Sequence, residues 1–283
     1  MDSPEHDFEE GLGSAERDGD RAKITVDKDE TLAQRIAELR ELRELRELEL
    51  SFVAPEHLSD LSQLTGLTKL SIICLDDGGT LPDISPISNL TGLKDLTVEY
   101  DGRQEEDWSG SLWHPTESPL RHLTGLTRLA TLQFSTRDVN FVGQLADLKH
   151  LELTEANALL DISGLSTLQG LTHLSLNFYD YDIYSWPRLP ALESLNLYGN
   201  EEMSSEQIRT LARMYPGLKF LDISSAGFAP LPDLRPLLRC PRLEVLVLGK
   251  KWMEELESTV GSTASTSALY PLLQVAVAEV KRR

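Results

Sequence analysis

The sequence predicts an α/β solenoid in which stacked repeats place a parallel β-sheet on the concave face and short helical or irregular segments on the convex side. An apolar spacing, L-x-x-L-x-L or a close variant, occurs nine times between Leu39 and Leu248. Within L-x-L, two apolar side chains point to one face of a short strand and the residue between them points to the other. One such unit cannot bury its own apolar edge, so consecutive units must stack and share a core.

The nine predicted strands follow one another at similar intervals. The strands contain Leu48-x-Leu50, Leu70-x-Ile72, Leu96-x-Val98, Leu132-x-Phe134, Leu151-x-Leu153, Leu174-x-Leu176, Leu195-x-Leu197, Leu221-x-Ile223 and Leu246-x-Leu248. The intervals between their first residues are 19 to 26 residues, except for one of 36 residues. This regularity predicts one array of about nine repeats with a single long insertion.

Three phrases of the sequence carry a resemblance to a known family. They are Leu61-Ser-Gln-Leu-Thr-Gly-Leu, Ile87-Ser-Asn-Leu-Thr-Gly-Leu and the nearly complete repeat from Leu189 to Asn200. The chain from Leu39 to Leu248 resembles the leucine-rich repeat family, mostly its short bacterial and SDS22-like type. The last repeat, with Cys240-Pro-Arg-Leu243, is similar to the ribonuclease-inhibitor type. The resemblance implies a right-handed, curved horseshoe.

The N-terminal part of the chain predicts a tail followed by the array. Residues 1–22 carry eight acidic residues against two arginines and almost no large apolar groups, which is typical of a disordered acidic tail. The repeat array is then expected over 23–249, with Ala22–Leu39 covering its first repeat. The long interval contains residues 101–119, which lack the leucine spacing and predict an insertion loop carrying Trp108 and Trp113.

Two helical segments are expected toward the C-terminus. Ser204–Met214 predicts a helix, since Ser204 and Gln207 have the spacing of a capping box. Residues 250–283 predict a helical cap over the last repeat, in which Ala268–Val280 has the apolar spacing of a helix. A partner-binding helix is the alternative for this segment.

Composition narrows the classes of partner. The net charge of −19 argues against nucleic-acid and anionic membrane binding, which rely on clustered lysine and arginine. A protein partner with a basic or polar surface is electrostatically favoured. No signal peptide or membrane span is evident, and the two cysteines lie in distant repeats, so we expect a cytoplasmic protein without a disulfide.

The outward-facing strand residues are the candidate binding surface. Alternation along the strands predicts a polar face. Its N-terminal end is largely acidic, and its C-terminal end is more apolar and aromatic. Lys69 is the only basic residue predicted on this face. The candidate partner-binding residues on this face are Glu49, Lys69, Asp95, Glu99, Gln133, His150, Glu152, His173, Asn177, Asn196, Tyr198, Phe220 and Asp222.

Aromatic residues in two loops extend this candidate surface. Tyr179, Tyr181 and Tyr184 alternate with aspartates after the sixth strand, which suits a basic ligand. Trp108 and Trp113 in the insertion loop are further candidates. The alternative is that Phe178, Ile183 and Trp186 only pack the turn, and that the tryptophans of the insertion loop anchor it to its own scaffold.

Enzymatic motifs are lacking. The chain has no phosphate loop, no dinucleotide fingerprint, no H-E-x-x-H and no C-x-x-C, and no cofactor or metal is predicted. One arrangement stays open as an alternative, because His150, Glu152 and His173 lie on one face of adjacent predicted strands and form a two-histidine, one-carboxylate set.

The sequence therefore predicts a noncatalytic scaffold that recognises a protein through its concave sheet and adjoining loops. One alternative is the ligand-sensing part of a bacterial NLR-like (NACHT-type) system whose nucleotide module lies in another chain. A metal-dependent enzyme subunit and a structural assembly protein are further alternatives. The sequence names neither the partner nor the oligomeric state.

Overall fold

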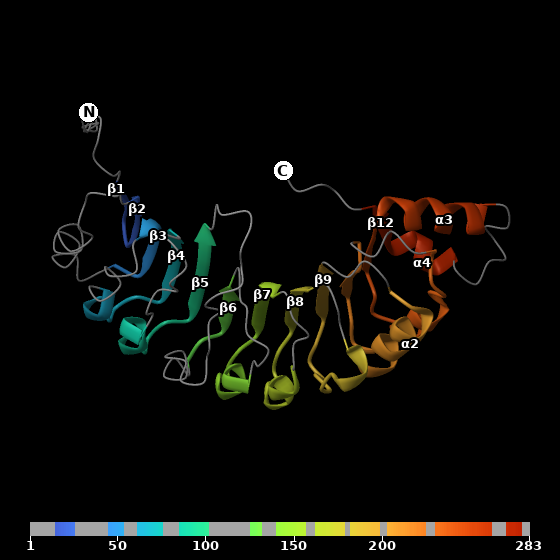
Figure 1. The fold of residues 1–283 in the computed structure, drawn as a ribbon, viewed down its shortest axis with the longest axis horizontal. Coiled ribbons are helices and arrows are strands. Elements are labelled where there is room, and N and C mark those ends of the chain that lie inside the picture. Colours follow the sequence, from blue (N-terminus) through green and yellow to red (C-terminus); the bar gives the residue numbers. More distant parts are fainter. Residues whose placement is uncertain are drawn as a thin grey trace. The chain divides into compact units, whose positions relative to one another are not determined.

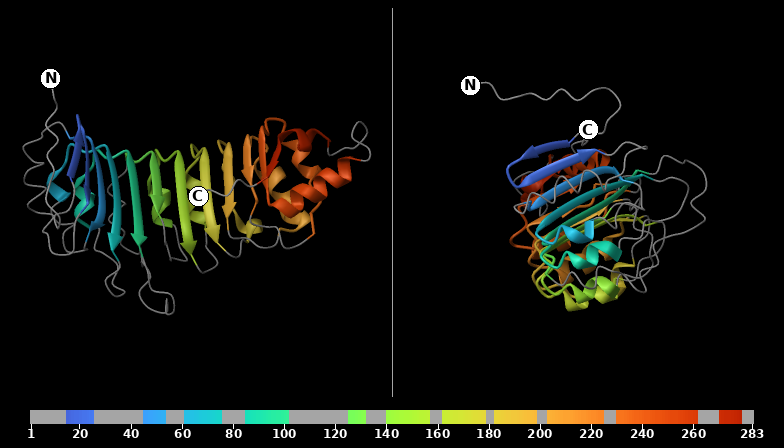
Figure 2. Two further views of the ribbon diagram at one scale, coloured as in Figure 1. Left: turned by 90° about the horizontal axis from the view of Figure 1, so that it is seen from above. Right: turned by 90° about the vertical axis from the view of Figure 1, so that its left-hand side faces the viewer.

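The computed structural model describes residues 15–25, 45–53, 61–75, 85–101, 125–131, 140–156, 162–178, 182–198, 203–224, 230–261 and 270–278. The chain forms two compact units, residues 1–132 and 133–283. In each unit the strands lie side by side in one sheet, and short helical segments lie behind them (Figures 1 and 2).

The described residues of the first unit form a sheet of six strands in sequence order. Its strands β2 to β6 pair in parallel, and β1 pairs with β2 in an antiparallel hairpin. The strands are β1 (Ala15–Asp18), β2 (Arg21–Thr25), β3 (Glu47–Val53), β4 (Lys69–Leu75), β5 (Asp95–Asp101) and β6 (Arg128–Thr131). The described return segments include a 3-10 helix, η2 (Ser85–Asn89).

The N-terminal hairpin differs from the sequence-based expectation of a disordered tail over 1–22. Residues 15–18 and 21–25 are strands, joined at Gly19, which has a positive φ of 60° that favours glycine. Ala22 is 6 % exposed and lies beside Leu48 in the register of β2 and β3. The hairpin thus caps the first repeat, and the predicted tail boundary lies inside β2. Residues 1–14 lie outside the described ranges.

The core of the first unit repeats one spacing of apolar residues. Leu61, Leu64, Leu67, Leu70 and Ile72 are buried, and the same spacing recurs 26 residues later in buried Ile87, Leu90, Leu93, Leu96 and Val98. Burying one such side chain contributes roughly 1.5–3 kcal/mol before the entropy of ordering is counted. The leucines that defined the repeat in the sequence are therefore the residues that hold it together.

Strand β6 corrects one predicted register. We expected Leu132-x-Phe134, whereas the strand is Arg128–Thr131 and Leu129 pairs beside Leu96. Leu126 and Leu129 are fully buried. Since leucines three apart recur here, the sequence offers two registers, and the structure selects the earlier one.

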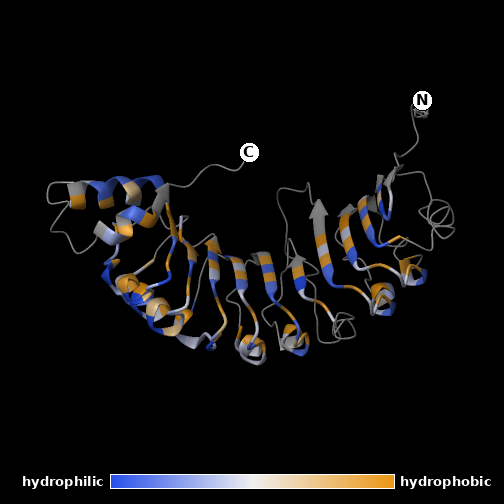
Figure 3. Cartoon of the chain, turned by 180° about the vertical axis from the view of Figure 1, so that it is seen from behind, coloured by the Kyte–Doolittle hydropathy of each residue, from blue (hydrophilic) through white to orange (hydrophobic). Residues whose placement is uncertain are grey.

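In the second unit, six parallel strands form a sheet within the described ranges. They are β7 (His150–Ala156), β8 (His173–Phe178), β9 (Ser194–Tyr198), β10 (Phe220–Asp222), β11 (Val245–Leu248) and β12 (Ala276–Ala278). Hydrophobic and hydrophilic residues alternate along many of the strands (Figure 3). The apolar residues of each L-x-L pair are buried, as the alternation predicted.

Short helices form the return segments of the second unit. They are the 3-10 helices η5 (Asn140–Gln144), η6 (Ser163–Thr167), η7 (Ile183–Ser185) and η8 (Arg235–Arg239), and the α-helix α2 (Ser205–Met214). The predicted capping box at α2 is present, because Gln207 N–H donates to Ser204 Oγ and Ser204 N–H donates to Gln207 Oε1.

The C-terminal cap combines helices with a strand. Helix α3 (Lys250–Gly261) buries Trp252, Leu256 and Val260, which lie four residues apart on one face. The helix expected over Ala268–Val280 is shorter, since α4 (Tyr270–Val275) is followed by β12. Strand β12 pairs in parallel with β11 and so satisfies backbone groups of that strand. No helix among the described residues is long and apolar enough to cross a membrane.

A shared carbonyl group links successive repeats. The carbonyl oxygen of Lys94 accepts hydrogen bonds from Thr127 N–H at 2.9 Å, Arg128 N–H at 3.0 Å and the Thr127 hydroxyl at 3.1 Å. The Lys149 carbonyl accepts the corresponding three bonds from the N–H groups of Thr172 and His173 and from the Thr172 hydroxyl. Each such carbonyl fixes the point at which the next strand begins, and thereby aligns the side chains across the sheet.

Candidate functional site

The candidate site is the sheet face opposite the leucine core, called here the open face of each unit. Strand register arranges its side chains in rows that run across the strands. In the first unit, the leading row contains Arg21, Glu47, Lys69, Asp95 and Arg128, and the central row contains Lys23, Glu49, Ser71, Thr97 and Ala130. The leading row therefore alternates in charge from strand to strand.

Neighbouring charges in these rows form ion pairs. Arg21 Nε lies 3.2 Å from Glu47 Oε2, and Lys23 Nζ lies 2.8 Å from Glu49 Oε1. Arg128 donates to Asp95 Oδ1 at 2.8 Å. Partly exposed pairs of this kind contribute about 0.2–1 kcal/mol each, so they fix side-chain positions more than they stabilise the fold.

The open face of the first unit is less acidic than the sequence suggested. Glu49, Lys69 and Asp95 lie on it as predicted, but Lys69 is not its only base. Strand β2 adds Arg21 and Lys23, and the corrected register of β6 adds Arg128. The expectation of an acidic N-terminal end was wrong because it left out the hairpin and misplaced one strand.

The open face of the second unit has a different character. Its leading row contains His150, His173, Ser194, Phe220 and Val245, and its central row contains Glu152, Ser175, Asn196, Asp222 and Val247. Asn177 follows on β8 and is half-buried. These rows change from imidazole and carboxyl groups to apolar groups along the strand order, as the sequence predicted.

Two histidines of the leading row stack on each other. The ring centroids of His150 and His173 are 5.4 Å apart and the rings are inclined by 20°. His150 Nε2 lies 4.0 Å from Glu152 Oε2. Because the ring planes are nearly parallel, their in-plane nitrogen lone pairs do not converge on one ion. Among the described residues, no group of three or more His, Cys, Asp or Glu could hold a metal.

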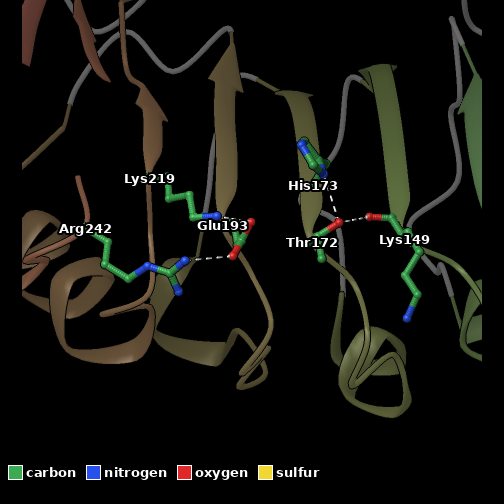
Figure 4. Close-up of polar contacts among 6 residues, drawn as sticks. All are labelled: Lys149, Thr172, His173, Glu193, Lys219 and Arg242. Carbon is green, nitrogen blue, oxygen red and sulfur yellow. Dashed lines mark hydrogen bonds and ion pairs between the residues drawn. The ribbon is translucent and has the colours of Figure 1, made fainter. Parts of the chain in front are cut away.

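Thr172 sets the hydrogen bonding of His173. Its hydroxyl donates to the Lys149 carbonyl and lies 2.9 Å from His173 Nδ1 (Figure 4). A hydroxyl has one proton to donate, so Thr172 Oγ1 accepts from a protonated Nδ1. Partial burial and the neighbouring His150 lower the pKa of His173, as Lys219 also does, while Glu193 opposes them. The lowered pKa favours the neutral ring, in which a proton on Nδ1 leaves Nε2 as the acceptor.

Glu193 is a site residue that the sequence reasoning missed. It accepts a hydrogen bond from Lys219 Nζ at 2.8 Å and lies 3.4 Å from Arg242 Nη2 (Figure 4). The hydrogen bond from Lys219 is the main cause of its lowered pKa. Glu193 directly precedes β9, as Thr172 precedes β8 and Lys219 precedes β10. This constant position before each strand was the available signal.

Three polar groups lie close to the strand end of β10. Asp222 is 7 % exposed, and its carboxyl group accepts a hydrogen bond from Ser224 N–H at 2.9 Å. Asn196 Oδ1 and Ser224 Oγ are buried oxygen atoms without a hydrogen-bond partner in the part of the chain that the structure describes. Phe220 is half-buried two residues before Asp222.

The predicted loop residues are described only in part. Tyr184, in η7, is 58 % exposed, whereas Ile183 and Trp186 are buried. The packing interpretation is therefore confirmed for Ile183 and Trp186. Trp108, Trp113, Gln133, Tyr179 and Tyr181 lie outside the described ranges, as do the side chains of Glu99 and Tyr198.

Comparison with known proteins identifies the fold. No protein-family model matches the sequence, and no curated protein matches it. Internalin C2 of Listeria monocytogenes has 19% identity over 78% of this chain and 93% of its own, with a TM-score of 0.52. TLR13 in its complex with ssRNA13 has 18% identity and a TM-score of 0.56, over 80% of this chain and 32% of its own. The internalin InlF from the same bacterium has 23% identity over 74% of this chain and 68% of its own, with a TM-score of 0.41. The strand arrangement and the first two likenesses together show a leucine-rich repeat solenoid of parallel strands with short helical return segments.

Proposed function

We propose that this protein is a noncatalytic recognition scaffold that binds a protein partner through the open face of its sheet and the adjoining loops. The observation that carries the proposal is the division of each strand into two sets of residues. The leucine positions are buried almost without exception, whereas the open-face positions hold charged, polar and aromatic side chains in fixed rows. Such a face presents many different groups on one rigid support, as protein recognition requires.

Charge favours a partner with basic or polar groups. The chain has a net charge of −19, which attracts basic surfaces over a distance of about one Debye length, roughly 8–10 Å in physiological salt. On the open face of the first unit, however, cations and anions alternate, so close contact there requires a partner whose charges are matched to the rows. Long-range attraction and short-range matching would together supply selectivity.

A protein partner is favoured over a nucleic acid on the same grounds. The similar solenoid of TLR13 is described in complex with a single-stranded RNA, so the fold itself accommodates such a ligand. Binding of nucleic acid depends on clustered lysine and arginine that neutralise phosphates. Here the bases of the first open face alternate with acids, and Lys219 and Arg242 in the second unit already bind Glu193.

The proposal is tested by site-specific photo-crosslinking in the native lysate. A benzophenone amino acid is placed at Ser71 or Ser175, which lie on the open faces, and at Asn89 or Gln169, which are exposed on return segments. The expected result is one protein partner, crosslinked from Ser71 or Ser175 and lost as salt is raised. Crosslinks from Asn89 and Gln169 alone, or none from any position, would overturn the proposal.

A further inference from the structure

The carboxyl group of Asp222 is buried without a cationic partner. Leu221 and Ile223, on either side of Asp222, are fully buried toward the core, so the alternation of an extended chain places Asp222 on the open face. Asp222 is nevertheless only 7 % exposed. In the described part of the chain, its one hydrogen bond comes from Ser224 N–H, and no lysine or arginine contacts it. The nearest base in sequence, Lys219, binds Glu193 instead.

Two neighbouring buried oxygen atoms also lack a hydrogen-bond partner among the described residues. Asn196 lies directly beside Asp222 in the register of β9 and β10, and no described residue bonds to its Oδ1. Ser224 is 3 % exposed, and its Oγ likewise has no hydrogen-bond partner within the described ranges. Adjacent strands are separated by about 4.8 Å, so these oxygen atoms lie within reach of one small ligand. We call Asp222, Asn196 and Ser224 the acceptor cluster.

The surroundings of the acceptor cluster are largely apolar. Phe220 precedes Asp222 on the same face, and Val245 and Val247 occupy the corresponding positions on β11. All three are half-buried, so their exposed parts border the cluster. Burial removes water molecules from the carboxylate, and a single hydrogen bond from the protein does not compensate for their loss. A cationic donor would supply the missing hydrogen bonds and a countercharge.

We propose that the acceptor cluster receives the cationic side chain of an arginine or lysine from the protein partner. This inference rests on the proposed function and names the chemistry of one contact. A guanidinium group has five N–H donors in a planar fork, enough for both carboxylate oxygens and the Asn196 amide. Its plane stacks on the ring of Phe220. The half-buried amide of Asn196 turns its oxygen to the ligand by rotation about χ2, a torsion with a broad energy minimum.

A metal ion is a poorer match to the same oxygens. Calcium takes six to eight oxygen ligands, commonly with several carboxylates. The acceptor cluster offers one carboxyl group, one amide and one hydroxyl, and no metal-binding group of acids and histidines lies among the described residues.

The test is a titration of the ¹⁵N-labelled full chain, followed by NMR, with the tripeptide acetyl-Gly-Arg-Gly-amide. The comparison peptide carries citrulline, which has the shape of arginine without its charge. We expect amide shifts in β9 and β10 with the arginine peptide alone. Asp222→Asn should weaken binding by about tenfold or more, because it removes the charge of a buried pair. The matched control Glu206→Gln, which changes a carboxylate paired with Arg209 on the return helix α2, should leave the affinity unchanged.

Other outcomes separate the explanations. Equal binding of both peptides, tighter binding of free L-arginine than of the peptide, or shifts in β9 and β10 with Ca²⁺ alone would each overturn the inference. If Asp222→Asn does not fold, Ser224→Ala keeps the carboxyl group and should still weaken peptide binding about threefold by removing one acceptor; unchanged affinity would count against the cluster. A photo-crosslinked partner that Asp222→Asn retains at full affinity would reject this contact and leave the recognition function standing.

Discussion

The imidazole rings of His150 and His173 stack across the adjacent strands β7 and β8, with their centroids 5.4 Å apart. Protonation of both rings would place two positive charges face to face. His150 is accordingly one cause of the lowered pKa of His173, after partial burial. The stacked arrangement therefore disfavours the charged form of His173, and several measurable consequences follow from this contact and from the packing around it.

Stability should fall as the pH is lowered through the range in which the unfolded chain binds a proton at this histidine. The pKa of His173 is lowered from 6.5, so below about pH 7 the unfolded state binds more protons than the folded state. The free energy of unfolding, measured in urea, should fall less between pH 7.5 and pH 5.5 for His173→Gln than for the wild type. The lowered pKa of Glu193 affects stability only below its usual value of 4.5, outside this window. An equal fall in the free energy of unfolding for the two proteins would refute the conclusion that His173 causes this pH dependence.

Thr172 should stabilise the fold through its hydroxyl group. Thr172→Val keeps the shape of the side chain and removes the bonds to the Lys149 carbonyl and to His173 Nδ1. The expected loss is about 0.5–1.5 kcal/mol in the free energy of unfolding. Thr91→Val, at an exposed turn position, is the control and should change little. The same stability in both variants would show that the shared carbonyl needs only its backbone donors.

Gly143 should tolerate no side chain. A Cβ atom there would lie 2.4 Å from the Gly164 carbonyl oxygen and 2.8 Å from Thr167 Oγ1, so η5 and η6 would have to separate. Gly143→Ala should cost about 1–3 kcal/mol, as overpacking usually does. At Gly217, the nearest atom, Leu192 O, would lie 3.5 Å away, which is ordinary contact. Gly217→Ala is the matched control in denaturant unfolding. An equal loss of stability in the two variants would contradict the close packing of Gly143 against the Gly164 carbonyl group.

The N-terminal hairpin should be part of the folded unit. Ala22→Asp would place a carboxyl group at a position that is 6 % exposed, against the first repeat. We expect a loss of about 1–3 kcal/mol. Lys23→Gln, the control, changes the adjacent, exposed residue and removes its ion pair with Glu49. A melting temperature unaffected by Ala22→Asp would mean that the hairpin does not cap the sheet in solution.

The leucine spacing was sufficient to predict most strands, because burial leaves little freedom in a unit that must stack on its neighbours. The register of β6 was predicted wrongly because Leu126, Leu129 and Leu132 are equally spaced and apolar. A glycine could have decided between the registers. Leu70 and Leu96 each follow a turn glycine by four residues, and Leu129 follows Gly125 by the same distance.

The ends of the array were harder to predict. Composition indicated disorder at one end and apolar spacing indicated a helix at the other, whereas pairing with the neighbouring strand forms a β-strand at each end. The acidic character of residues 1–22 suggested disorder, yet Ala22 and Ile24 alternate as a strand requires and pair beside β3. Near the other end, the helical spacing was correct up to Val275. The next three residues instead complete the pairing of β11.

The candidate site could be predicted as a face but not as a set of contacts. Alternation placed His150, His173 and Asp222 on the correct side of the sheet. It could not show that two histidines stack, that Asp222 is buried, or that Glu193 joins Lys219 and Arg242, because those depend on side-chain distances between strands.

Because successive repeats share a carbonyl group, the alignment of two neighbouring strands does not depend on the length of the loop that connects them. From Glu47 to Lys69 the chain advances 22 residues, and from Asp95 to Arg128 it advances 33, yet each pair lies side by side in the sheet. The long connection leaves no shift in the row, because Arg128 N–H is still held by the carbonyl of Lys94. The register of these strands is thus independent of the difference in length between the two connections, so the row of open-face side chains stays continuous across the longer one.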